Sequence, residues 1–424
     1  MQQKFFGWRV VAAAFVLAVF GWGLGFYGPP VYLHAVQEAR GWSVALVSAA
    51  VTVHFLVGAV VVANLPRLYR RFGIPTITKA GAISLAVGVA GWALALAPWQ
   101  LLLATLLSGA GWVAMGAAGV NAIVAPWFVK KRPAALSMAY NGASIGGVVF
   151  SPLWVVAIGG LGFPLAAAVI GAVMVVTIWL LSDLVFSRTP QSMRQLPDGA
   201  SADSDPPVAS AASRVDLWRD KRFLTLAAAM ALGLFAQIGL IAHLFSLIVP
   251  ALGEQWAGIV MGAATAAAIA GRSGVGWLMP PGSDRRFVAC ASHGVQIAGS
   301  VALMFAAGDN IVLLVAGVLL FGAGIGNTTS LPPLIAQVEF TKEDAARVVT
   351  LIVAIGQGTY SFAPAIFGAI RSLSTAETAV VFAAAALFQA LAVAVFLWGR
   401  QAPDQRGGRL PRNASMPSRK SALP

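Results

Sequence analysis

Apolar runs of about 20 residues recur along this 424-residue chain, and they constrain its fold more than any other feature. Such a run is long enough to cross the hydrocarbon core of a bilayer as an α-helix. Only 10% of the residues are charged, against about a quarter in a typical soluble domain. The runs lie at about 8–33, 43–65, 75–97, 99–127, 134–158, 163–186, 223–250, 255–279, 287–307, 310–337, 345–370 and 376–399. We therefore predict an all-α membrane protein with twelve transmembrane helices.

The spacing of the runs divides the chain into two halves. We predict an N-terminal six-helix bundle at residues 1–186 and a C-terminal six-helix bundle at residues 223–400. Residues 187–222 are rich in Ser, Pro and Asp, a composition that buries too little apolar surface to fold alone, so we expect a flexible cytoplasmic linker. Residues 401–424 are similarly polar, and we expect a disordered cytoplasmic tail.

The two halves also resemble each other internally. The stretch GAGWVAMGAAGVNAIVAPW (109–127) has a counterpart in GAGIGNTTSLPPLIAQVEF (322–340). Each is followed by a short charged loop and then by a helix that ends in proline, GGVVFSP in one half and GTYSFAP in the other. Two pseudo-symmetric six-helix units are typical of carriers, whose substrate site lies between the halves near the bilayer midplane.

The positive charges lie on one side of the predicted membrane. Outside the linker and tail, that side carries Lys4, Arg9, Arg67, Arg70, Arg71, Lys79, Lys130, Lys131, Arg132, Arg285, Arg286, Lys342 and Arg347. The other side carries only Arg40 and Arg371. The positive-inside rule then places both termini and the linker in the cytoplasm, and we expect a multi-pass protein of the plasma (inner) membrane. Topology thus explains the net charge of +13, and we expect no nucleic-acid partner.

Several classes of chemistry are excluded by the sequence. The single cysteine, Cys290, rules out an internal disulfide and a cysteine metal site. The chain has no P-loop, no paired carboxylates and no metal-ligand cluster, so we expect neither an enzyme nor a cofactor nor a bound metal. A channel would call for a ring of like groups, which the sequence does not offer.

Arg272 is the most unusual residue, because it lies inside the apolar run AAAIAGRSGVGWL (266–278). An arginine at a helix centre costs about 2.5–3.5 kcal/mol on insertion scales. Its neighbours one helical turn away are Ala268, Ile269, Val275 and Gly276, none of which is an acid. Since a guanidinium fork binds a carboxylate through two hydrogen bonds, we predict that Arg272 anchors an anion. The alternative is a structural arginine that bonds a helix carbonyl or snorkels to the membrane surface.

Other polar side chains within the runs are candidates for the same site. They are Tyr27, His54, Asn121, Tyr140, Ser144, Gln237, His243, Asn327, Gln357 and Tyr360. The two histidines could bind substrate or carry a proton, because an imidazole titrates near physiological pH. The alternative for each residue is packing inside a bundle, since small and polar residues also hold membrane helices together.

Over nearly its full length the chain resembles the major facilitator superfamily. The loop between helices 2 and 3 of that family reads G-x-L-x-D-R-x-G, and here PRLYRRFG matches it at Leu68, Arg71 and Gly73. Pro66 and Arg70 replace the first glycine and the aspartate. The resemblance implies the major facilitator fold, transport by alternating access and a conformational role for this loop.

A second stretch, APWFVKKRPAALSMAYNGASIGGVVFSPL (125–153), resembles the helix 4–5 hairpin of the monocarboxylate transporters and oxalate/formate antiporters. Those families carry an arginine in helix 8 that binds the substrate carboxylate, and Arg272 falls at that place. They also carry an aspartate where this chain has Ala268, and lysines in helix 1 or helix 11 that it lacks. The resemblance implies a monomeric secondary transporter of a small carboxylate, with proton symport, exchange and uniport left open. The alternatives are an exporter of amphiphilic or drug-like compounds and a non-transporting membrane sensor.

Overall fold

The computed structural model describes residues 5–198, 216–280, 282–306, 310–373 and 378–400, and the regular structure in these ranges is helical. The first half contains α1 (Gly7–Gly25), α2 (Gly28–Arg40), α3 (Val44–Phe72), α4 (Ile74–Leu94), α5 (Pro98–Met115), α6 (Ala117–Val124), α7 (Arg132–Leu161) and α8 (Phe163–Leu181). The second contains α9 (Lys221–Leu278), α10 (Arg285–Ala306), α11 (Ile311–Glu339), α12 (Lys342–Tyr360), α13 (Ala363–Leu373) and α14 (Ala379–Trp398). Short helical turns η1 (Ala125–Trp127), η2 (Ser182–Phe186) and η3 (Leu217–Arg219) complete the described chain.

The described residues contain 11 apolar helical segments that are long enough to span a membrane. The longest, α9, contains two helices joined at Gly253, whose φ of 73° lies in the left-handed region that glycine adopts readily. The 58 residues of α9 would extend about 87 Å as one straight helix, far more than a bilayer is thick. The segment therefore supplies two crossings, which brings the total to the twelve that the apolar runs predict.

Three of the crossings are interrupted near their middle. The first breaks between α1 and α2, where the adjacent prolines Pro29 and Pro30 lack the N–H groups that a continuous helix needs. A second breaks at Gly116, between α5 and α6, and a third between α12 and α13, just before Pro364. These breaks leave backbone carbonyls without helical partners, and side chains of neighbouring helices can bind them.

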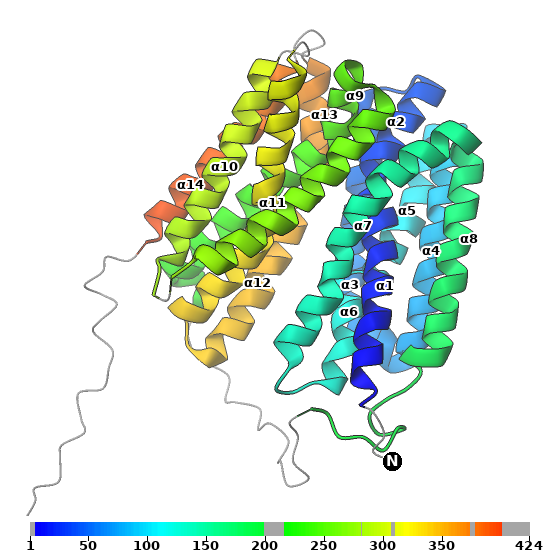
Figure 1. The fold of residues 1–424 in the computed structure, drawn as a ribbon, viewed down its shortest axis with the longest axis vertical. Helices are drawn as coiled ribbons and strands as arrows, with labels where there is room; N and C mark the ends of the chain where they lie inside the picture. The colour runs from blue at the N-terminus through cyan, green and yellow to red at the C-terminus, as the bar shows by residue number, and fades with distance from the viewer. Residues whose placement is uncertain (1–4, 199–215, 281, 307–309, 374–377, 401–424) are drawn as a thin grey trace, which may run out of the picture.

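The helices form two bundles that meet at one end of the molecule. Figure 1 shows α1–α8 in one bundle and α9–α14 in the other, with the ribbons diverging toward the end at which the N-terminus lies. We call that end the linker end and the opposite end the far end. The bundles join where α7 packs on α9, α3 on α13 and α2 on α9. At the far end the amide of Ala365 donates to Thr52 Oγ1 (3.0 Å), and His34 Nε2 lies 3.4 Å from Glu254 Oε1.

The contact between α7 and α9 depends on glycines that let the backbones approach. A Cβ atom on Gly258 would lie 2.9 Å from Val155 Cγ2, and one on Gly262 would lie 2.9 Å from the carbonyl oxygen of Val148. Small residues of this kind are typical of close helix contacts in membranes. The two halves are therefore in direct van der Waals contact along this line.

Part of the predicted linker is docked on the first half. The Asp198 carboxylate accepts hydrogen bonds from the amides of Val129 (2.7 Å) and Lys131 (2.9 Å), and Gln195 Oε1 accepts one from the amide of Phe6 (2.9 Å). Residues 187–198 are thus held against the loop before α7 and the start of α1. The segment 199–215 and the tail 401–424 lie outside the described residues, so the flexibility predicted for them stays a prediction.

Candidate functional site

Arg272 lies where three helices from both halves meet. Its Nη2 donates a hydrogen bond to Ser144 Oγ of α7 (3.3 Å), which belongs to the opposite half. Its stem packs against α11, because a Cβ atom on Gly326 would lie only 3.0 Å from Arg272 Cβ. The guanidinium is therefore held between the two bundles.

The charge of Arg272 has no counter-ion in the described part of the chain. Ion pairs there join Lys79 to Asp183, Arg219 to Asp216, Arg222 to Asp220, Arg286 to Glu339 and Arg400 to Asp284, and His34 lies beside Glu254. Arg272 belongs to none of them, and Ser144 offers it only a neutral hydroxyl. A half-buried cation between two bundles can therefore accept an anion without first breaking an ion pair.

Tyr27 reaches the same region from the first half. Its ring lies beside Thr265 of α9, the helix that carries Arg272. Gly147 of α7 makes room for this contact, because a Cβ atom there would lie 2.6 Å from both Tyr27 Cζ and Thr265 Cγ2. The structure thus brings together the predicted residues Arg272, Ser144 and Tyr27. Thr265 is not among the residues predicted from the sequence, although its spacing of seven residues from Arg272 places both on one face of the helix.

Aromatic side chains extend from Tyr27 across the face of the first half. Ring centroids lie 5.0 Å apart for Phe26 and Tyr27, 6.0 Å for Phe26 and Trp112, and 5.1 Å for Trp112 and Trp22. The series continues from Trp22 to Tyr140 (6.4 Å), and from Phe26 through Phe55 (6.1 Å) to Tyr360 of α12 (5.8 Å). We call these seven residues the interface aromatics: Trp22, Phe26, Tyr27, Phe55, Trp112, Tyr140 and Tyr360. Of these seven residues, only Tyr27, Tyr140 and Tyr360 are predicted from the sequence.

His54 is buried inside the first half and is not brought to Arg272. Its Nε2 donates to the carbonyl oxygen of Gly25 at the break in the first crossing (2.9 Å). Its Nδ1 accepts from Ser108 Oγ (2.8 Å), which itself accepts from Trp92 Nε1 (3.2 Å). Both ring nitrogens of His54 therefore have hydrogen-bond partners, and the residue stabilises the break between α1 and α2.

Three other predicted residues are buried on helices of the second half. His243 is buried and donates through Nε2 to the carbonyl oxygen of Pro364 (3.1 Å), beside the break before α13. Gln237 Oε1 accepts a hydrogen bond from Gln296 Nε2 (3.1 Å), and Asn327 is buried on α11. These contacts join helices of the second half to one another. The hydrogen bonds of His243 and Gln237 thus do not involve Arg272, while Asn327 directly follows Gly326, which packs on the stem of Arg272.

The remaining predicted residues are spread over both halves. Asn121 is exposed on α6, and Gln357 is half-buried on α12. Tyr140 donates to the carbonyl oxygen of Ala117 (2.9 Å), just beyond the break at Gly116. Tyr140 thus belongs to the face between the halves through its ring, while its hydroxyl is used to hold α6.

The conformational-loop motif lies at the linker end of α3. Leu68 packs against the apolar core, and the exposed Arg71 guanidinium lies 5.1 Å from the ring centroid of Phe72. Gly73 ends the helix with a φ of 82°, a conformation that favours glycine. The loop therefore makes a sharp turn from α3 into α4.

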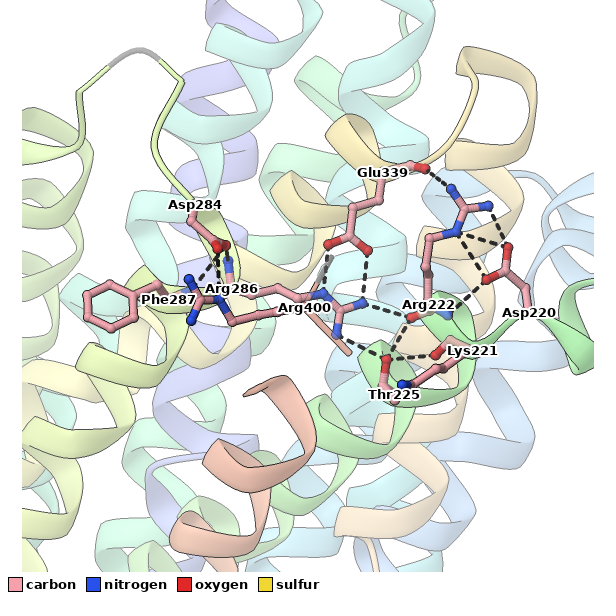
Figure 2. Close-up of polar contacts among 9 residues, drawn as sticks. All are labelled: Asp220, Lys221, Arg222, Thr225, Asp284, Arg286, Phe287, Glu339 and Arg400. Atoms are coloured by element: carbon pink, nitrogen blue, oxygen red, sulfur yellow. Dashed lines mark hydrogen bonds and ion pairs between the residues drawn. The ribbon is translucent and has the colours of Figure 1, made fainter. Parts of the chain in front are cut away.

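A network of charges occupies the corresponding end of the second half (Figure 2). Arg286 is only 1% exposed and binds Glu339 through Nε (2.6 Å) and Nη2 (2.8 Å). It also donates to Thr225 Oγ1 (3.0 Å) and to the carbonyl oxygen of Arg222 (2.9 Å). These contacts tie α10, α11 and the start of α9 together. The sequence places Arg286 only among the basic residues on one side of the predicted membrane and does not predict this ion pair.

A second pair extends this network toward the linker. Arg222 binds the Asp220 carboxylate (2.6 Å) and donates through Nη1 to the backbone carbonyl of Glu339 (2.7 Å). Burial alone would raise the pKa of Asp220, but the hydrogen bonds and charge of Arg222 outweigh it and hold that pKa below its ordinary value. The ionised pair therefore stabilises the fold at neutral pH, and this contribution is lost only as the pH falls through the lowered pKa of Asp220.

Comparison with known proteins identifies the family to which this architecture belongs. Residues 13–364 match the family profile described as Major Facilitator Superfamily. The MFS-type transporter 1 of Ophiocordyceps sp. (strain BCC 1869) is 28% identical over 357 residues, covering 81% of this chain and 74% of the relative. The crystal structure of the nucleoside transporter NupG superposes with a TM-score of 0.71 at 12% identity, covering 92% of this chain and 98% of that one.

A second solved structure has the same fold. It is a bacterial homolog of the human lysosomal transporter Spinster in an inward-facing and unoccupied conformation, with a TM-score of 0.67 at 15% identity, and it covers 95% of this chain and 100% of that one. At such identities the likeness shows the fold alone, and it confirms the predicted all-helical membrane architecture. The match to the family profile covers most of the chain. The chain belongs to the major facilitator superfamily and is a multi-pass secondary transporter, not an enzyme.

Proposed function

We propose that the cargo is a small organic anion whose carboxylate binds Arg272. The observation that carries this proposal is a half-buried guanidinium between the halves that has a neutral hydroxyl, and no acid, as its partner in the described chain. The fork of Arg272 suits a carboxylate, and the hydroxyls of Ser144 and Tyr27 can donate to the same oxygens. The likeness of residues 125–153 to the monocarboxylate and oxalate/formate carriers supports the same substrate class.

The position of the site accounts for coupling between binding and movement. Arg272 and Ser144 belong to different halves, so an anion bound between them contacts both bundles. Alternating access requires the halves to rock around a central site. The far end is closed by the contacts of α3 with α13 and of α2 with α9, so the bound anion leaves toward the linker end. We further propose that the linker end is cytoplasmic, because the basic residues gather there.

The same charge argues against a carrier of apolar cations. An unpaired guanidinium repels a cationic drug, whereas it attracts a carboxylate.

The two buried histidines differ in whether they can take up a proton for proton-coupled transport. His54 uses both ring nitrogens, while Nδ1 of His243 has no hydrogen-bond partner among the described residues. If a histidine carries the proton, His243 is the one that takes it up without losing a hydrogen bond.

The substrate class is tested by comparing acids with their amides. We expect lactate, pyruvate and phenylacetate to raise the unfolding temperature of the purified protein in detergent, and the corresponding amides to leave it unchanged. A ligand at 100 times its Kd stabilises the native state by about 2.7 kcal/mol. The amides match the acids in shape but carry no charge. Equal stabilisation by an acid and its amide would contradict a carboxylate site at Arg272.

A methyl group at Gly326 is expected to disturb the same site from α11. In Gly326→Ala, the new Cβ would lie 2.8 Å from the carbonyl oxygen of Ala268 and 3.0 Å from Arg272 Cβ, so α9 and α11 must separate. Such overpacking costs about 1–3 kcal/mol, and it changes the position of Arg272 relative to Ser144. We expect weaker stabilisation by lactate in the thermal assay. Gly294→Ala is the control, because no atom lies within 4 Å of its added Cβ; a similar loss there would show that the effect is not local.

A further inference from the structure

The first half contains two aromatic clusters that differ in how completely they are buried. Tyr32, Trp92, Trp154 and Phe163 pack together with 1%, 1%, 0% and 9% of their surfaces exposed, as expected for a closed core. The interface aromatics behave differently. Phe55 and Trp112, at the centre of this cluster, are buried, whereas Trp22, Phe26, Tyr27, Tyr140 and Tyr360 around them are each only half-buried. Ring surface is therefore left uncovered in the second cluster.

The cluster of interface aromatics reaches the second half at two places. At one end of the cluster, Phe55 contacts Tyr360 of α12 (5.8 Å between ring centroids). At another, Tyr27 lies beside Thr265, on the helix that carries Arg272. Both ends of the cluster thus reach helices of the opposite bundle. Trp22 lies on another branch of the cluster, which runs through Trp112 and ends at Tyr140 of α7, the helix that packs on α9.

The cluster also lies next to the proposed anion site. Tyr140 and Ser144 are one turn apart on α7, and Tyr140 contacts Trp22 (6.4 Å between ring centroids). Ser144 in turn accepts the hydrogen bond of Arg272. A molecule whose carboxylate binds Arg272 therefore has aromatic side chains beside the rest of its body. Aromatic rings prefer edge-to-face or offset contacts with another ring over contacts with an aliphatic group of similar area.

We propose that the transported anion is an aromatic carboxylate, with its ring against Trp22 and its carboxylate on Arg272. This inference rests on the proposed function, because it takes Arg272 as the carboxylate site. It narrows the substrate from any small carboxylate to one with an arene a few atoms from the acid. Trp22 selects the ring, and Arg272 selects the charge.

The test compares phenylacetate with cyclohexylacetate, which has the same acid group and a saturated ring. Binding to the purified protein is measured by isothermal titration calorimetry in detergent. We expect phenylacetate to bind about 2- to 10-fold more tightly than cyclohexylacetate. In Trp22→Leu this preference should disappear, and in Trp22→Phe, which keeps a ring, it should persist. Trp277→Leu should also retain the preference, because that indole is 87% exposed near the end of α9.

Two sets of outcomes separate the inference from the proposed function. Equal affinity of the unaltered protein for the two acids, or a preference that survives Trp22→Leu, overturns the aromatic inference. In either case, loss of binding in Arg272→Gln would leave the carboxylate site standing. If Arg272→Gln binds phenylacetate as the unaltered protein does, the proposed function fails and the inference fails with it.

Discussion

The Arg272→Gln protein should fold normally and lose most of its affinity for carboxylates. The guanidinium supplies a charge and two parallel hydrogen bonds to one anion, whereas glutamine supplies a neutral amide. Charge-assisted contacts of this kind contribute about 2–5 kcal/mol when one partner is truncated. At 1.4 kcal/mol for each factor of ten, Kd for lactate or phenylacetate should rise by about 30- to 4000-fold. Calorimetry with the purified proteins measures the difference.

The stability of the ligand-free variant decides between a functional and a structural arginine. A structural arginine would leave unpaired groups behind when it is removed, and the unfolding temperature would fall. An arginine whose partner is the bound anion instead lowers the stability of the ligand-free protein, since inserting it at a helix centre costs about 2.5–3.5 kcal/mol. We therefore expect an unchanged or higher unfolding temperature in Arg272→Gln. A lower unfolding temperature with unchanged carboxylate binding would contradict the proposed role.

Two further variants control this experiment. Arg219→Gln removes a cation whose side chain is 90% exposed and should change neither stability nor binding. Arg272→Lys keeps the charge but replaces the planar fork with a single ammonium group. It should bind carboxylates more weakly than the unaltered protein and more tightly than Arg272→Gln. The order of the three affinities therefore separates the contribution of the charge from that of the paired hydrogen bonds.

Much of the fold could be predicted because hydropathy alone specifies which segments enter a bilayer. The run predicted at 134–158, for example, lies within α7, Arg132–Leu161, and the reversal after residue 250 was placed correctly although α9 continues through it. The interruption at Gly116 was not predicted, because a glycine in an apolar run is compatible with an unbroken helix as well as a broken one.

The candidate site was predicted only in part, and the reason lies in what each residue type costs inside a membrane. Arg272 stands out because a charge in an apolar run requires an explanation. Trp22 and Trp112 do not stand out in the sequence, because an aromatic side chain is as common in a closed core as at an interface. His54 and His243 were placed in spanning segments, but the sequence does not tell which face of a helix meets the other half. Their hydrogen bonds instead hold breaks within their own halves.

The largest loss of stability should follow removal of the acid that pairs with Arg286. In Glu339→Gln, the guanidinium of Arg286 keeps its 1% exposure and its bonds to Thr225 and Arg222 but loses both charge-assisted bonds to the carboxylate. Truncating one partner of a buried ion pair costs about 3–5 kcal/mol, because the other charge remains buried and uncompensated. Since the pair joins α10 to α11, the unfolding temperature in detergent should fall clearly.

A matched pair and a double variant show whether the buried charge is the cause. Asp216→Asn removes the acid of the exposed Arg219 pair, whose side chains are 58% and 90% exposed, and should change stability by at most about 1 kcal/mol. Adding Arg286→Met to Glu339→Gln removes the uncompensated charge, so the double variant should be more stable than Glu339→Gln alone. An equal loss in the single and double variants would show that the packing of the Glu339 side chain matters, and not its pairing with Arg286. Because the network lies at the linker end and not beside Arg272, carboxylate affinity should remain that of the unaltered protein wherever the variant stays folded.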